Sequence, residues 1–139
     1  MIVEISKYIN LKHTKVSLSF GNFYFFDKFI ISEVNEGVHF SWNEGQQLFE
    51  IAKKHYGKEG RVTYISNRIY SYSQHAQDWL KFFNRYNNID ALAIVTYSKI
   101  GLMNIVLEKI FSKVPIKTFQ SLDGAIEWVM QPKSAQKVK

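Results

Sequence analysis

The chain has 139 residues, a length that suits one domain of ordinary size. Hydrophobic residues make up 46% and charged residues 22%, a balance typical of a folded domain rather than a disordered chain. The absence of cysteine excludes a disulfide scaffold, a thiol nucleophile and a cysteine-ligated metal. No apolar run approaches the roughly 20 residues of a membrane-spanning helix, and the N-terminus lacks a continuous apolar segment, so we expect a soluble cytoplasmic protein.

The formal net charge of +6 is concentrated near the two ends of the chain. Residues 132–139 contribute +3 and residues 1–15 contribute +2, which leaves +1 for everything between them. Nucleic-acid binders usually gather basic residues on one folded face, so nucleic acid is not an expected partner. We expect an N-terminal extension over residues 1–15, an α/β domain over 16–131, and a disordered basic tail over 132–139. Whether residues 1–15 add a strand or hang free stays open.

Two strands are predicted first. Residues 16–26, VSLSFGNFYFF, are rich in β-formers, and their apolar residues alternate until the phase shifts at Gly21. A bulge or a tight hairpin turn would explain the shift, and we favour one long bulged strand. Residues 29–34, FIISEV, form a second strand that should pair antiparallel with the first.

Two helices and a strand follow. Ser41 and Glu44 match a capping box, so a helix begins there and ends at Gly57. Its inward stripe is Leu48, Phe49, Ala52 and Tyr56. Residues 61–66, RVTYIS, form a third strand. The next helix begins between Ser71 and His75, because Ser71 with Gln74 also fits a capping box, and its apolar face is Ala76, Trp79, Leu80 and Phe83.

The last part of the chain alternates strands and helices. Residues 90–96 contain ALAIV, a continuous apolar run typical of a central strand. Ser98 caps a helix whose inward face is Met103, Val106, Leu107 and Ile110. Residues 114–119 form a short strand, and Ser121 caps a final helix that ends before Pro132. The inward face of that helix is Leu122, Ala125, Ile126 and Val129.

The order of elements is therefore strand, strand, helix, strand, helix, strand, helix, strand, helix. Alternating strands and helices call for right-handed crossovers and a mainly parallel sheet. The opening antiparallel pair makes the sheet mixed. We predict a single α/β domain with a mixed sheet of about five strands and helices packed on it.

The sequence lacks the motifs of common catalytic sites. Its seven glycines are dispersed, so it has neither a phosphate-binding loop nor a dinucleotide fingerprint. The four histidines share no metal-ligand spacing. Glu33 and Glu36 are the one close pair of acids near a strand end, but strand residues three apart point to opposite faces. We expect a non-enzymatic protein without a metal or a cofactor.

A binding site is predicted at the carboxyl ends of the parallel strands, where ligands and partners of open α/β sheets tend to bind. Residues 66–73, 96–99 and 120–121 meet there, and each segment leads into a helix N-terminus that favours an anion. Arg68 and Lys99 would add positive charge. Helix capping by the serines and packing by the tyrosines is an equal alternative. The predicted binding residues are Asn67, Arg68, Tyr70, Ser71, Tyr72, Ser73, Tyr97 and Lys99.

The predicted helix over residues 100–111 is apolar around most of its circumference. Ile100, Leu102, Ile105 and Phe111 lie outside its inward stripe. Such a helix is either deeply buried or covers a partner or ligand. A dimer face and the wall of an apolar pocket both fit, and we favour deep burial.

The pattern resembles a known fold family. The element order, the segment FYFFDKFIISEVNEG and the loop YISNRIYSYS resemble the STAS-like fold of the bacterial anti-sigma-factor antagonists, the SpoIIAA-like proteins. A related architecture occurs in Sec14-type (CRAL-TRIO) lipid carriers. The segments NEGVHFSW, ISNRIYSYS and SLDGAIEWV are more closely similar to small bacterial STAS/Sec14-domain proteins of unknown role. The resemblance covers roughly residues 16–130.

The resemblance implies a non-enzymatic regulatory module that binds a protein partner through the loop after the third strand. In the antagonists, a partner kinase phosphorylates a serine at the start of the following helix, in an Asp-Ser-Ser-Gly-like run. The added negative charge releases the partner. This chain lacks that run, and Ser71 and Ser73 are its candidate phosphoacceptors. The alternative is a carrier or sensor of a small apolar ligand, held between helix 100–111 and the sheet. A homodimer is also compatible with the sequence.

Overall fold

The computed structural model describes residues 1–132, and six strands of this region form one mixed sheet in the order β1-β2-β3-β5-β7-β8. The first three strands pair antiparallel, and β3, β5, β7 and β8 run parallel. The strands are β1 (His13–Leu18), β2 (Gly21–Phe26), β3 (Phe29–Val34), β5 (Val62–Arg68), β7 (Ile89–Thr96) and β8 (Ile116–Phe119). This architecture confirms the predicted α/β class and the mixed sheet.

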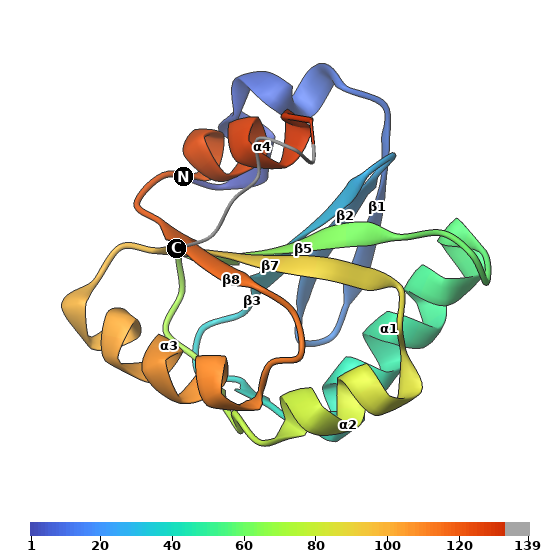
Figure 1. The fold of residues 1–139 in the computed structure, drawn as a ribbon. Helices are drawn as coiled ribbons and strands as arrows, with labels where there is room; N and C mark the ends of the chain where they lie inside the picture. The colour runs from blue at the N-terminus through green and yellow to red at the C-terminus, as the bar shows by residue number, and fades with distance from the viewer. Residues whose placement is uncertain (133–139) are drawn as a thin grey trace.

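Helices cover both faces of the sheet (Figure 1). One face carries α1 (Trp42–Tyr56), α2 (Asp78–Arg85) and α3 (Lys99–Phe111). The other face carries α4 (Leu122–Met130) and two short 3-10 helices, η1 (Val3–Ile5) and η2 (Lys7–Asn10). Among residues 1–132, no helix combines the length and the apolar character needed to cross a membrane.

The prediction of one long strand over residues 16–26 is wrong, because β1 and β2 form a hairpin. The phase shift reflects a turn at Ser19 and Phe20, where the Phe20 ring enters the core and packs edge-on against Phe23 and Phe40. Gly21 then lets β2 approach β3, since a Cβ there would lie about 2.6 Å from the carbonyl oxygen of Glu33. The split strand accounts for six strands where about five were expected.

Residues 1–15 pack against the sheet instead of hanging free. The side chain of Val3 is buried beside Tyr24 and α4, and His13 already belongs to β1. Ser6 Oγ donates to Asp123 at 3.1 Å, and the Tyr8 hydroxyl donates to Glu127 at 3.1 Å, so the segment is joined to α4. Residues 133–139, which make up nearly all of the predicted basic tail, lie outside the described residues.

Three of the four predicted helix starts are confirmed. The Glu44 carboxylate accepts from the amide of Ser41 at 2.9 Å and completes the capping box of α1. The hydroxyls of Ser98 and Ser121 accept from the third residue beyond them and cap α3 and α4. Gly57, with φ of 81°, ends α1 in the left-handed region that favours glycine. The inward stripe of α4 is also buried as predicted.

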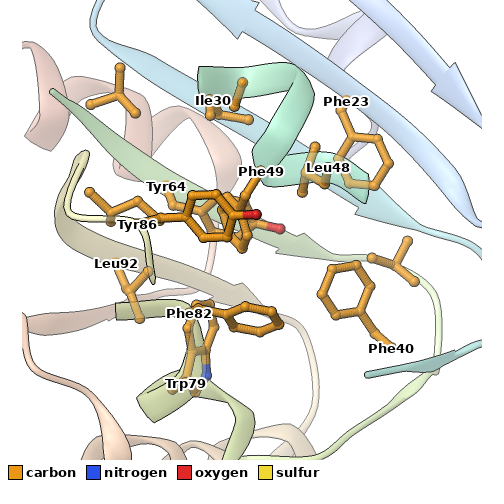
Figure 2. Close-up of a cluster of buried hydrophobic side chains, with 14 of the residues drawn as sticks. Phe23, Ile30, Phe40, Leu48, Phe49, Tyr64, Trp79, Phe82, Tyr86 and Leu92 are labelled. Carbon is orange, nitrogen blue, oxygen red and sulfur yellow. The ribbon is translucent and has the colours of Figure 1, made fainter. Parts of the chain in front are cut away.

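The start of α2 was predicted too early. Ser73 and Gln74 form the short strand β6 (Ser73–Gln74), which pairs in parallel with β4 (His39–Phe40), so the backbone there is extended. The helix begins at Asp78, and its predicted apolar face is confirmed only in part, since Trp79 and Phe83 are buried. Leu80 is 39% exposed, whereas Phe82, which was not predicted, is 2% exposed and lies in the core (Figure 2).

Candidate functional site

A cavity of about 800 Å³ opens at the carboxyl ends of β5 and β7, beside α3. It brings together Arg68, Tyr70, Ser71, Tyr72, Ser73 and Tyr97 from the predicted site. Asn67 and Lys99 do not line it, and neither do residues 120–121. Two of the three connections predicted to meet at this sheet edge line the cavity, and binding there stays a prediction.

A buried ion pair forms the inner wall of the cavity. The guanidinium of Arg68 donates two hydrogen bonds, each 2.6 Å long, to the two carboxylate oxygens of Glu108 on α3. The same carboxylate accepts from Gln74 Nε2 at 2.9 Å and from Trp79 Nε1 at 3.0 Å. The side chain of Glu108 is 3% exposed and that of Arg68 is 13% exposed, so both charges are removed from water. Such a bidentate pair is geometrically specific and fixes α3 against β5.

Arg68 is held fully charged by these neighbours. Burial alone would lower its pKa, but Tyr72 and the Glu108 carboxylate together raise the pKa of the guanidinium above its ordinary value. Its positive charge is compensated inside the protein. The prediction that Arg68 offers this charge to an anion at the sheet edge is therefore wrong, because Arg68 is paired with Glu108.

Ser71 and Ser73 lie in an extended segment and do not cap a helix, which corrects one of the two roles considered for them. The amide of Ser71 donates to Glu36 Oε1 at 3.1 Å, and the Ser73 hydroxyl lies 2.7 Å from His39 Nδ1. Both serines are exposed. Phosphorylation at either serine stays a prediction.

Asn67 belongs to a second polar cluster on the opposite face of the sheet, because successive strand residues point to opposite faces. Its Nδ2 donates to Glu33 Oε2 at 3.1 Å and to the carbonyl oxygen of Met1 at 2.8 Å, and its Oδ1 accepts from the Tyr97 hydroxyl at 2.9 Å. Glu33 also accepts from the amide of Val3 at 2.7 Å. The N-terminal residues thus cover this part of the sheet edge.

Glu33 should make stability depend on pH. Burial raises its pKa above the ordinary glutamate value of 4.5, although the hydrogen bonds from Val3 and Asn67 oppose this change. The folded state then holds the Glu33 proton more tightly than the unfolded state. Its contribution to stability is greatest at acid pH and is lost as pH rises from 4.5 through the raised pKa.

The expected result is that wild type loses stability relative to Glu33→Gln as pH rises from about 4.5 to 7. Each unit by which the pKa is raised corresponds to about 1.4 kcal/mol. Urea unfolding of both proteins at several pH values measures the difference directly. A difference that stays constant across this pH range would contradict the assignment.

The outer face of α3 is where the structure differs most from the prediction. Its exposed large apolar residues are Leu102 (43%), Met103 (72%), Val106 (62%), Leu107 (55%) and Ile110 (67%). We call these five residues the apolar face of α3. Four of them were predicted to point inward, and deep burial of the helix was favoured. The helix instead turns Ile105 and Glu108 toward the protein, because Glu108 is held by Arg68, Gln74 and Trp79.

Glu108, Gln74 and Trp79 were not recognised as parts of the site. Glu108 is the only acid in Lys99–Phe111, a helix otherwise rich in apolar residues. A lone carboxylate in such a helix was the available signal, since burial would require a cation such as Arg68. Within residues 1–132, no group of three or more histidine, aspartate or glutamate side chains could hold a metal ion.

The arrangement of sheet and helices defines a SpoIIAA-like fold. A solved structure with this fold, an uncharacterised protein of the DUF3478 family from Shewanella loihica PV-4, is similar to 85% of this chain and 92% of its own, with a TM-score of 0.53. The identity is 11%, so the similarity establishes the fold alone. No family model matches the sequence, and no curated protein matches it.

Proposed function

We propose that the chain is a non-enzymatic regulatory module that binds another protein through the apolar face of α3 and the adjoining cavity. The observation that carries the proposal is the exposure of five large apolar side chains on one short helix. Monomeric proteins rarely expose contiguous apolar patches of this kind unless the patches serve binding. Burying one such side chain fully contributes about 1.5–3 kcal/mol, so several together can hold a partner.

The rim of the cavity supports the same function. Tyr70 and Tyr97 are 43% and 45% exposed beside α3, and tyrosine is enriched at protein interfaces. Leu107 and Asn104 of α3 also line the cavity, so the apolar face of α3 continues into it. A partner could therefore cover the helix and insert a side chain into the cavity.

The alternative of an apolar-ligand carrier has less support. The space between α3 and the sheet holds Ile105 and the buried ion pair, and the only aliphatic side chains among the described residues that line the cavity beside it are Ile69, Ala76 and Leu107. Ligand cavities are usually lined by apolar and aromatic side chains. Native mass spectrometry tests this alternative, since a carrier would retain a small molecule that is lost on denaturation.

The proposal predicts that Val106→Ser/Ile110→Ser abolishes partner binding without unfolding the protein. Both side chains are exposed, so the change removes contact area but little of the core. We expect a partner recovered with wild type, then purified, to lose at least about 100-fold in affinity by calorimetry. The control is Ile5→Ser/Met130→Ser, which changes side chains that are 70% and 53% exposed outside α3. Equal binding by the α3 variant and wild type would contradict the proposal.

A further inference from the structure

The apolar face of α3 has the geometry and the charges to receive one kind of partner. Resting on the proposed function, we propose that the partner presents an acidic amphipathic helix, with an apolar stripe against this face and carboxylates around it.

The spacing of the apolar side chains favours a helical occupant. Met103, Val106, Leu107 and Ile110 stand at positions i, i+3, i+4 and i+7, so they form one ridge along two turns of α3. A ridge of this kind packs into the groove of a second helix, and helix recognition is commonly anchored at these positions. The flexible Met103 side chain can adapt to the shape of such a groove.

Three lysines that form no ion pair in the described part of the chain lie near the ridge. Lys99 and Lys109 lie on α3, Lys113 follows it and donates from Nζ to Asn84 Oδ1, and all three are exposed. Within residues 1–132, none of the three forms an ion pair with a carboxylate. Glu108, the sole acid of α3, is turned inward onto Arg68. The lysines therefore place positive charge near the apolar face of α3, and the net charge of +6 would also speed the approach of an acidic partner.

Two other occupants fit these charges less well. A second copy docked by α3 in two-fold symmetry would bring Lys99 of one copy toward Lys109 and Lys113 of the other, with no carboxylate to separate them. An anionic membrane surface is typically bound by clusters of about four to eight basic residues. The three lysines near α3 fall below that range.

The test is a display selection on the purified full chain. The probe is a library of amphipathic helices of about 18 residues. Leucines form one stripe in every member, and glutamate or lysine is randomised on both sides of the stripe. Selection is run on wild type, on Lys99→Glu/Lys109→Glu/Lys113→Glu, and on the apolar-face variant Val106→Ser/Ile110→Ser. The control is Lys12→Glu/Lys28→Glu/Lys58→Glu, which changes net charge equally at exposed lysines outside α3.

We expect glutamate-rich helices on wild type and on the control, with about tenfold preference over lysine-rich ones, as three exposed ion pairs would give. The α3 charge-reversed variant should select lysine-rich helices instead. Enrichment regardless of charge, lost only in the apolar-face variant, would overturn the acidic partner and leave the proposed function intact. No enrichment on any protein would overturn the helical partner, and the affinity of wild type and Val106→Ser/Ile110→Ser for a recovered partner then decides the proposed function. A dimer detected by sedimentation would identify a second copy as the occupant, and binding to phosphatidylglycerol vesicles would identify a membrane, provided that the signal is lost in the apolar-face variant. Either result would overturn the acidic helix.

Discussion

Replacing Glu108 by alanine is expected to lower the free energy of unfolding by about 3–5 kcal/mol. The substitution leaves the Arg68 guanidinium buried without its counter-charge, and it leaves Gln74 and Trp79 without an acceptor. A buried charge that loses its partner costs far more than an exposed pair is worth. Urea unfolding followed by tryptophan fluorescence gives the change directly.

Two matched variants separate the contribution of the ion pair to stability from that of the surrounding hydrogen bonds and packing. Glu108→Gln keeps the size of the side chain and one acceptor oxygen, so it should cost less than alanine but still leave Arg68 without a counter-charge. The double variant Arg68→Met/Glu108→Leu removes both charges and should recover most of the loss, because apolar replacements of buried pairs are often neutral or stabilising. A loss below about 1 kcal/mol for Glu108→Ala would mean that the pair is solvated in solution.

Phe82→Ala is expected to cost about 3–5 kcal/mol, the usual range for removing a buried aromatic ring. The Phe82 ring stacks on Trp42 with centroids 5.1 Å apart, and it also contacts Phe49 at 5.2 Å and Trp79 at 5.6 Å. It also lies against Gly45, where α1 has no side chain to displace it. Figure 2 shows Phe82 and Trp79 projecting from α2 into this cluster.

The control for Phe82 stands on the same helix. Leu80→Ala removes an apolar side chain that is 39% exposed, so its effect should stay within about 0.5 kcal/mol. Thermal unfolding of both variants under the same conditions compares their losses of stability. Equal losses for the two variants would contradict the burial of Phe82 and the exposure of Leu80.

Periodicity predicted most elements of this fold because their patterns are local. The capping box of Ser41 and Glu44 and the ALAIV run depend on neighbours within a few residues, and those elements formed as expected. The errors arose where a contact between residues far apart in sequence determines the local structure. Residues 71–75 form an extended segment because β6 pairs with β4, some 34 residues away in sequence. The hairpin between β1 and β2 depends on the burial of Phe20 against Phe40, which alternation alone does not reveal.

Six of the eight predicted binding residues line one cavity at the sheet edge, and the strand order was enough to group them. The partner of Arg68 did not follow from the strand order, because Glu108 lies 40 residues further on and its role depends on the rotation of α3. The same rotation exposes Met103, Val106 and Ile110, which a helical pattern identifies as one face without saying which way it points.

The contact between the first residues and α4 bears on how the protein folds as it is made. Ser6 and Tyr8 bond to Asp123 and Glu127, which leave the ribosome more than a hundred residues later. Contacts this distant in sequence form late, because the loop they close is long. Until α4 emerges, Val3 and the apolar residues of β2 and β3 on that face have no cover. This face of the core can therefore close only after α4 has been synthesised.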